Sequence, residues 1–536
     1  MIKIAMIILS MFLGFGVATV GGIDNVYAQK KTSNVKKSKS KKRKKRKSRY
    51  KRNKAREMSF ALRLARARNY EQATKVLYRL SKDKLFRKER PQIKYLLGLM
   101  LYEMKLYQGA SYQFVGTIQL GNSKYINRAL EKLVISASYL EDSRLLNYAL
   151  SKVEIKKFPK SRWDLLRFRI AEVYERKKDY SNAVKYYEMI RSSSAFYARA
   201  KYKSAYISAK IGKPRLAVRK FQNLLESYKD APVTNDNRVA AVLGLARSYY
   251  QANMWDKAVE YYRQVPRDSE AWHEGLFEMS WAQLRTGKFR SVLSNFHTLH
   301  SDYYRNDFLP ESLLLRGIVY LYICKYDEMA KTLDLFKSIY IPVAKDIRSY
   351  LKSKPRSNKI YNDFSVFYND YENFSQEIDS KKYRLPTMIY KNIYNQGDVQ
   401  SGVSYVFKLV SEKDRLSELS PEWQNSRVGK NLSRLLEKRI KAAKRRLGLS
   451  VRGYLVKYYK EVVRIEEQEE FARFELANSQ KDTLRAQILS GQEQTIDNNA
   501  DRDFYIQNGY EYWPYLGEYW LDEIGNYHYL GKSSCK

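Results

Sequence analysis

The chain has 536 residues, with 100 Lys and Arg against 57 Asp and Glu, so its formal net charge is +43. This length allows several domains or one long repeat array with a substantial core. The charge indicates attraction to polyanions such as nucleic acid, anionic lipid or acidic surface polymers, and alone it does not choose among them. Four histidines leave little material for a histidine-based catalytic or metal centre, and two cysteines are few for a secreted chain.

Residues 1–28 have the pattern of a secretory signal peptide. One lysine precedes an uncharged run from Ile4 to Val20, and a small-residue site predicts cleavage after Ala28. No Cys follows this run, which excludes a lipoprotein anchor at this point. The many positive charges that come next oppose translocation, so the alternative is an uncleaved inner-membrane anchor. We favour export to the periplasm.

Residues 29–56 are expected to form a disordered polybasic segment. Seventeen Lys or Arg and no acid lie between Lys30 and Arg56, and such a segment cannot bury enough apolar surface to fold. In an exported protein its expected partners are anionic lipid head groups or cell-wall polymers, and a solvated linker is the alternative. Nucleic acid would meet this segment only in an uncleaved cytoplasmic chain, and no nucleic-acid-binding fold motif supports that hypothesis.

Residues 57–345 predict an array of about eight helix pairs. Small and aromatic residues recur at fixed spacing, with a period of about 34 residues in the clearest units. The small residues allow two helices to approach closely, and the aromatic residues fill the space between neighbouring pairs. No pair can bury its own apolar face, so stacked pairs form one continuous core. The clearest unit contains Ala171, Tyr174, Ala183, Tyr187 and Ile190.

This pattern resembles the tetratricopeptide repeat. The resemblance implies an all-α solenoid superhelix whose concave groove is lined by the first helix of each pair and binds peptides or partner proteins. Aromatic residues beside Arg are typical anchors of protein interfaces. For each groove position, packing against the adjacent helix is the alternative. By register, the groove positions include Tyr202, Tyr206, Arg247, Tyr250, Phe277 and Trp281.

Residues 346–490 predict a helical domain. Pro421 begins a basic helix with one apolar face, and a second helix from Val451 to about Gln487 has a heptad seam. Gly448 and Gly453 bracket the junction. The two helices therefore predict an antiparallel, coiled-coil-like hairpin. We expect it to pack on the last repeat, and the alternative is that it is offered to a partner.

Residues 504–535 form an aromatic C-terminal motif. Aromatic and β-forming residues alternate with turn residues, which predicts a small β-hairpin-like segment. The motif either covers the exposed end of the array or provides a recognition patch. Its candidate functional residues are Trp513, Glu518, Trp520, Asp522, Glu523 and Tyr527.

The signal, the array, the hairpin and this ending together resemble a family of deltaproteobacterial envelope proteins. Members include the periplasmic tetratricopeptide protein of adventurous gliding motility, the GltE or AglT type. The resemblance implies a non-enzymatic scaffold in a multiprotein envelope complex that transmits motor force to the cell surface. The matching residues are Gly517, Glu518, Tyr519, Trp520, Asp522, Glu523, Gly525, Tyr527, Tyr529 and Cys535.

The sequence predicts no catalytic site, cofactor or metal, since it has no Gly-rich phosphate loop and no G-x-S-x-G motif. His297 and His300 lie three residues apart, but no third ligand accompanies them, so a helix-surface pair is expected. Cys324 and Cys535 could form a disulfide in an oxidising compartment, and the sequence leaves their pairing open.

Two principal hypotheses follow. The first is an exported scaffold that mediates protein–protein interactions in an envelope complex, with gliding motility as its setting. The second is a polyanion-binding adaptor whose basic arm docks on the cell wall or an anionic membrane. A cytoplasmic nucleic-acid-associated adaptor is a weaker third hypothesis, because it requires an uncleaved signal.

Overall fold

The computed structural model describes residues 55–121, 123–142, 144–150, 163–372, 382–490 and 524–529, together with Gly531, Ser533 and Cys535. The predicted signal peptide and nearly all of the polybasic segment lie outside these residues. The chain divides into two units, Met1–Arg56 and Glu57–Lys536, and almost everything described below belongs to the second. The described residues form helices and contain no strand, which confirms the all-α prediction for this part of the chain.

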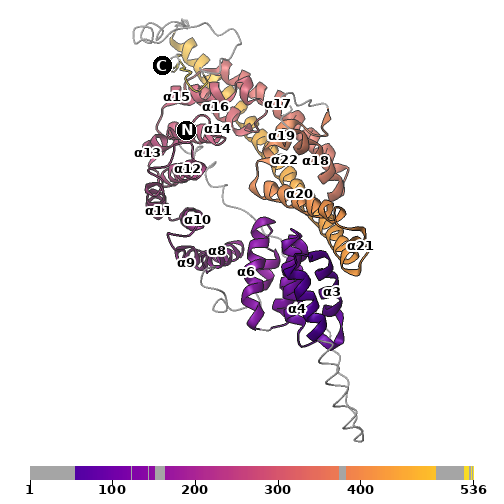
Figure 1. Cartoon of the computed structure of the whole chain (residues 1–536). Helices are drawn as coiled ribbons and strands as arrows, with labels where there is room; N and C mark the ends of the chain where they lie inside the picture. The colour runs from indigo at the N-terminus through magenta and orange to yellow at the C-terminus, as the bar shows by residue number, and fades with distance from the viewer. Residues whose placement is uncertain are drawn as a thin grey trace, which may run out of the picture. The chain divides into compact units, whose positions relative to one another are not determined.

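Eight helix pairs lie within the described part of residues 55–352, and we number them as repeats 1 to 8 (Figure 1). Consecutive helices pack against each other from α3 to α7 and from α8 to α17. In chain order the pairs are residues 55–66 with α3 (Tyr70–Lys82), α4 (Arg90–Glu103) with α5 (Tyr107–Gln119), α6 (Ser123–Tyr139) with α7 (Arg144–Leu150), α8 (Trp163–Arg176) with α9 (Tyr180–Glu188), α10 (Tyr197–Lys210) with α11 (Pro214–Glu226), α12 (Asp236–Gln251) with α13 (Trp255–Tyr262), α14 (Trp272–Arg285) with α15 (Phe289–Leu299), and α16 (Pro310–Tyr322) with α17 (Tyr326–Lys352).

Every pair turns through one residue in the left-handed backbone conformation. In repeat 2, for example, Lys105 has a φ of 60°, and the Leu106 N–H donates to the Leu101 carbonyl at 2.8 Å, which closes the end of α4. Only two of the eight turn residues are glycines, so most turns place a side chain where glycine fits best. The eight residues are Arg68, Lys105, Glu141, Lys178, Gly212, Asn253, Gly287 and Cys324.

The small positions of the repeat pattern lie where helices make their closest approach. Ala171 and Ala183 are fully buried in repeat 4, and Tyr187 packs between them and the next repeat as a buried ring. In repeat 2 the same role falls to Gly98, because a Cβ there would come within 2.6 Å of the Phe114 ring. The predicted small-and-aromatic pattern therefore corresponds to the packing that joins the repeats.

Beyond the array, helices α18 to α22 form a segment that we call the C-terminal helices. Helix α17 first continues through Pro342 to Lys352, past the point at which the repeat pattern ends. The C-terminal helices pack on one another, and they also contact α3 and α5 near the start of the array and α16 and α17 at its end. Their bounds are α18 (Ser357–Glu372), α19 (Thr387–Tyr394), α20 (Gly397–Ser417), α21 (Pro421–Gln424) and α22 (Arg427–Ser490).

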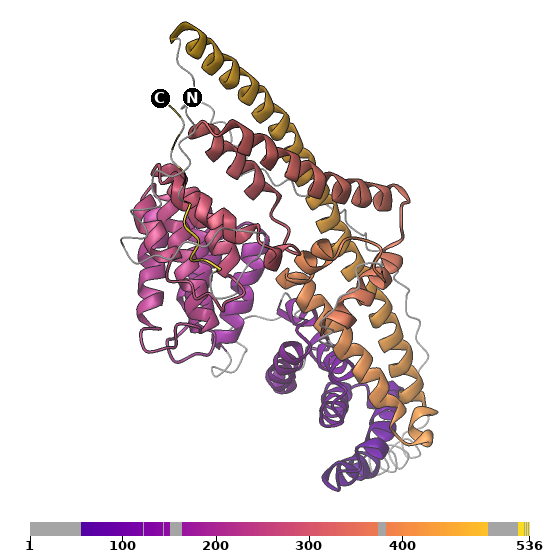
Figure 2. The ribbon, with the colours of Figure 1, turned by 90° about the horizontal axis from the view of Figure 1, so that it is seen from above.

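The predicted helical hairpin at Gly448 and Gly453 is wrong, because α22 is one continuous helix of 64 residues (Figure 2). A glycine inside a helix costs only about 1 kcal/mol relative to alanine, and extended packing along α18, α20 and α17 outweighs that cost. Gly448 serves a close approach instead: a Cβ there would collide with the Ser357 carbonyl oxygen at the start of α18. The hairpin that does form is between α20 and α22.

The predicted β-hairpin-like ending falls mostly outside the described residues. The described part of residues 504–535 contains a turn at Ile524 and Gly525 and no strand. Gly525 has a φ of 89°, a backbone conformation that suits glycine. The structure therefore gives no support to a β-hairpin in this part of the segment.

Candidate protein-binding surface

The six predicted groove residues lie on the first helices of repeats 5, 6 and 7. Tyr202 and Tyr206 belong to α10, Arg247 and Tyr250 to α12, and Phe277 and Trp281 to α14. The pairs therefore come from three consecutive first helices of the array. We call these six residues the aromatic row.

Arg247 joins repeat 6 to repeat 7. Its Nε lies 2.8 Å from Glu278 Oε2, and its Nη2 lies 3.0 Å from Glu274 Oε1, both on α14. The Tyr262 hydroxyl donates to the same Glu278 oxygen at 3.0 Å. Burial alone would lower the pKa of Arg247, but the two carboxylates outweigh it, so the pKa lies above its usual value. The positive charge of Arg247 is thus compensated mainly by the two glutamates of the next repeat.

The aromatic members differ in exposure. The Tyr206 side chain is 42% exposed, and the ammonium groups of Lys203 and Lys210 lie 5.9 and 5.7 Å from its ring centroid. Tyr202 is half-buried, with its ring edge-on to Phe221 of α11 at 5.4 Å. The other three aromatic residues are half-buried against the core. Part of each aromatic side chain therefore packs against the protein, and the rest is accessible to a partner.

The C-terminal residues cross repeats 7 and 8. The Gly525 N–H donates to Thr298 Oγ1 at 3.1 Å, and the Tyr529 N–H donates to Ser294 Oγ at 2.9 Å, both acceptors lying on α15. The Tyr527 ring lies edge-on to His297 at 4.5 Å. Of the predicted motif residues only Tyr527 is described. The other five, Trp513, Glu518, Trp520, Asp522 and Glu523, lie outside the described residues.

A disulfide joins Cys535 to Cys324, the turn residue between α16 and α17. The two Cα atoms lie 5.1 Å apart across a sequence separation of 211 residues. The Ser533 hydroxyl also donates to the Ile323 carbonyl at 3.4 Å. The end of the chain is thus attached covalently to repeat 8.

The two histidines considered as a metal pair have other neighbours. His300 Nε2 lies 2.8 Å from Ser312 Oγ, and its Nδ1 lies 3.2 Å from the Arg316 guanidinium. Burial and the adjacent Arg316 lower the pKa of His300 well below its usual value, so the ring is neutral. No cluster of three or more His, Cys, Asp or Glu suited to a metal occurs among the described residues.

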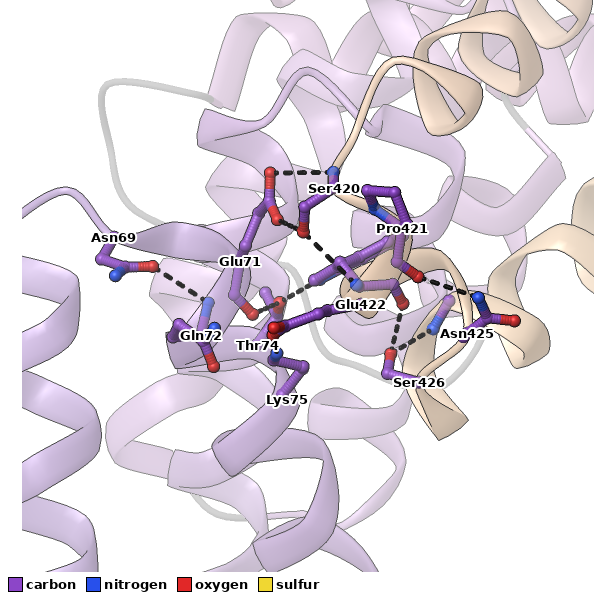
Figure 3. A network of polar contacts seen from close by, with 12 residues as sticks. Asn69, Glu71, Gln72, Thr74, Lys75, Ser420, Pro421, Glu422, Asn425 and Ser426 are labelled. Atoms are coloured by element: carbon purple, nitrogen blue, oxygen red, sulfur yellow. Dashed lines mark hydrogen bonds and ion pairs between the residues drawn. The ribbon is translucent and has the colours of Figure 1, made fainter.

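A second site, which the sequence did not predict, attaches the C-terminal helices to repeat 1 (Figure 3). Trp423 of α21 is fully buried, and its Nε1 donates to Thr74 Oγ1 of α3 at 2.8 Å. The Ser420 hydroxyl donates to the Glu71 carboxylate of α3, and it also accepts the Trp423 N–H as the cap of α21. In the sequence, Trp423 follows the Ser-Pro start of a helix, but this local pattern does not indicate which helix it packs against.

Glu412 of α20 makes the corresponding attachment to repeat 2. Its two carboxylate oxygens accept the N–H groups of Gln108 at 2.8 Å and Gly109 at 3.1 Å, in the first turn of α5. These N–H groups have no partner within their own helix, and the helix N-terminus favours an anion. Burial nevertheless raises the pKa of Glu412 to about 7, opposed by the two N–H groups and by Arg415.

A close approach of α22 completes this second site. A Cβ on Gly109 would come within 2.4 Å of Leu432 Cδ2 of α22, so any larger residue there would force the buried Leu432 side chain to shift. The Tyr405 hydroxyl of α20 donates to Gln108 Oε1 at 2.9 Å. We call the contacts of Trp423, Glu412 and Leu432 with repeats 1 and 2 the N-terminal attachment.

Within the described part of the chain, no helix combines the length and the apolar character that crossing a membrane requires. The segment predicted as a signal peptide lies outside the described residues.

Family models of the tetratricopeptide repeat match residues 166–194 and 202–271, which lie within repeats 4 to 6 and the loop that follows. A comparison with curated proteins finds no match. The chain therefore contains tetratricopeptide repeats, as the sequence pattern predicted. Such repeats generally serve as non-enzymatic scaffolds that bind other proteins.

Several solved structures match parts of this chain. A kinesin light chain with nearly identical repeats from Podosopora anserina is 16% identical with a TM-score of 0.29, over 33% of this chain and 94% of that one. Pseudomonas aeruginosa pilF is 15% identical with a TM-score of 0.28, over 41% and 96%. A Rap protein in complex with Competence and Sporulation Factor is 11% identical with a TM-score of 0.28, over 68% and 99%. All three TM-scores are low, so the repeats are identified by the family models.

Proposed function

We propose that this protein is an exported scaffold of a cell-envelope complex, which binds a partner protein through the aromatic row. The observation that carries the proposal is that three consecutive first helices each carry exposed or half-buried aromatic side chains of the row. Half-buried aromatic residues with fixed bases make strong interface anchors, because little side-chain freedom is lost when a partner covers them. Tyr206, the most exposed aromatic of the row, would contribute most.

Two observations support export. Residues 1–28 carry the signal-peptide pattern, and Cys324 is bonded to Cys535. Disulfides persist in oxidising compartments and are rare in the cytosol. A periplasmic location therefore fits both ends of the chain.

The setting that we propose is a gliding-motility type of envelope machinery. This finer assignment rests on the resemblance of the terminal motif, most of which lies outside the described residues. A non-enzymatic array attached at both ends to a long helix would suit the transmission of force between envelope components. The proposal therefore assigns the protein no reaction, cofactor or metal.

Fractionation of cells, followed by sequencing of the mature N-terminus, tests the location. We expect a periplasmic protein that begins at Gln29. A full-length chain on the cytoplasmic side would refute export. The polybasic segment would then be able to meet cytoplasmic polyanions, including nucleic acid.

Site-specific photo-crosslinking tests the binding surface. We expect a crosslinker in place of Tyr206 to trap one envelope protein, and Trp281→Ala to reduce the yield of that product. The matched control is a crosslinker in place of Tyr303, which is 62% exposed on the short helix Asp302–Tyr304, outside the aromatic row. Equal yields of the same product at both positions would refute the aromatic row as the binding surface.

A second candidate function is a polyanion-binding adaptor. The seventeen cations between Lys30 and Arg56, without an acid among them, favour it. Binding through such an arm depends on exposed charges and is screened by salt. Release of the protein from envelope fractions by high ionic strength would support this function, whereas salt-resistant retention would favour the protein scaffold.

A further inference from the structure

The first part of helix α22 has two chemically opposite faces. One face is apolar and buried against the neighbouring helices, with Val428, Leu432, Leu436, Ala443 and Leu447 at or below 5% exposure. The opposite face carries a cation at every third or fourth position, and each of these side chains is exposed. We call this face the basic ridge. Its members are Arg427, Lys430, Arg434, Lys438, Lys441 and Arg445.

The cations of the ridge are not neutralised by their surroundings. None of the six forms an ion pair with another described residue, whereas cations beside the ridge do. Arg439 reaches Asp142 at 3.7 Å, and Lys413 of α20 reaches Glu437 at 3.7 Å. The flanking residues are thus used within the fold, while the ridge points a row of uncompensated charges at solvent.

The charge of α22 is also divided along its length. The ridge belongs to a stretch, residues 427–464, that contains thirteen Lys or Arg and two acids. The next stretch, residues 465–482, contains six acids and two cations. A solvated helix surface commonly mixes the two signs, so this division indicates that the first stretch serves a separate purpose.

We propose that the basic ridge docks on an anionic membrane surface. The six cations span about 27 Å along a straight helix, so all of them can meet a flat surface together. A Lys or Arg close to an anionic bilayer contributes about fivefold to affinity. All six members of the ridge are Lys or Arg. The contact is therefore electrostatic, and it places no side chain in the hydrocarbon core of the membrane.

A membrane fits the ridge better than a single-stranded nucleic acid. A single-stranded nucleic acid is bound by aromatic residues interleaved with cations, and the ridge contains no aromatic residue. The proposal does not depend on export, because anionic lipid faces both sides of an inner membrane. It also differs from docking by the polybasic segment, since the ridge is a face of a packed helix.

Vesicle cosedimentation of the full chain tests the proposal. The vesicles contain equal parts of phosphatidylglycerol and phosphatidylcholine, and vesicles of phosphatidylcholine alone measure background. We expect the triple variant R434Q/K438Q/K441Q to bind the anionic vesicles at least tenfold more weakly than the natural chain. Gln is a good helix former, and thermal unfolding followed by circular dichroism checks that the fold is kept.

The matched control is K213Q/R215Q/R219Q, which removes the same number of exposed cations from the second helix of repeat 5 and the residue before it. We expect less than a twofold effect for this variant. Equal weakening by both variants would refute the ridge, because net charge alone would then explain binding. Soluble heparin serves as a polyanion that is not a membrane. If the ridge variant bound heparin more weakly but bound the vesicles as the natural chain does, a membrane partner would also be refuted.

Discussion

The first and last repeats are both covered by the C-terminal helices, yet the two attachments differ in kind. At the start of the array, Trp423 and Glu412 are fully or almost fully buried against repeats 1 and 2. At the end, α22 packs along α16 and α17, where its fully buried Glu469 pairs with Lys337 of α17, and polar groups nearer the surface add to this contact. Arg473 of α22 lies 2.7 Å from Asp334 of α17, and the Tyr326 hydroxyl lies 3.0 Å from Thr483 Oγ1.

Repeat 8 has a further attachment in the Cys324–Cys535 disulfide, which ties down the end of the chain. Buried contacts contribute through packing and desolvation, while exposed ion pairs contribute little each. Burial therefore holds both ends of the array, whereas among the described residues a covalent bond is added only at repeat 8. Four predictions test this difference.

Trp423→Ala should have the largest effect. Removing a fully buried indole leaves a cavity, so we expect a loss of about 3–5 kcal/mol in the free energy of unfolding of the N-terminal attachment. Hydrogen exchange of the α3 amides measures this local stability. Trp423→Phe is the control, because it keeps much of the volume and loses only the bond to Thr74. A loss below 1 kcal/mol for the alanine variant would contradict a burial-based attachment.

Removing the disulfide should have the next largest effect, and at the other end of the array. We expect Cys324→Ser with Cys535→Ser to lower the free energy of unfolding by about 2–4 kcal/mol, because the bond closes a long loop. Protection of the Gly525 and Tyr529 amides from exchange should fall, while that of the α3 amides should not. A reductant should reproduce the effect in the natural chain and leave the variant unchanged.

Glu412 should make the N-terminal attachment sensitive to pH. Its pKa is about 7 in the folded protein and about 4.5 ordinarily, so folding favours the protonated carboxyl. The stabilisation is complete below about pH 4.5, decreases as the pH rises and is lost above about pH 7, a change of up to about 3 kcal/mol. Glu412→Gln should abolish this pH dependence in denaturant unfolding. The same pH dependence in the variant would show that another group is responsible.

Asp334→Ala should have the smallest effect. The Asp334 side chain is 70% exposed, and its pairing with Arg473 is typical of surface ion pairs, which contribute less than about 1 kcal/mol. We expect a change of that size in unfolding free energy, reduced further by added salt. A loss as large as that of the tryptophan variant would contradict a minor role for this ion pair beside the buried packing of α22 on α17.

The sequence predicted the repeats well because their signal is local. Ala171, Ala183 and Tyr187 follow one another at fixed spacing, and each contributes to packing within or between neighbouring pairs. The turns were harder to place, since residues such as Lys105 and Glu141 adopt the left-handed conformation without a glycine signal. The six residues of the aromatic row were placed by register on first helices, and their binding role stays a prediction.

The seam of the second predicted helix illustrates both success and failure. Its apolar positions, from Val451 to Leu476, are buried as the heptad spacing predicted. Glu469 interrupts the seam in the sequence, and in the structure its buried carboxylate pairs with Lys337 at 3.2 Å and with Arg473. The glycines upstream indicated a turn, but packing along α18, α20 and α17 keeps the helix continuous.

By itself, the sequence determined the helical class, the repeat type and the strongly basic character, because these follow from local spacing and composition. Only the tertiary structure decided that α22 is one helix, that Trp423 and Glu412 attach to repeats 1 and 2, and that Cys535 reaches Cys324. These contacts join residues some 200 to 350 positions apart, where no local pattern selects the partner. Burial and close approach between whole helices select it instead.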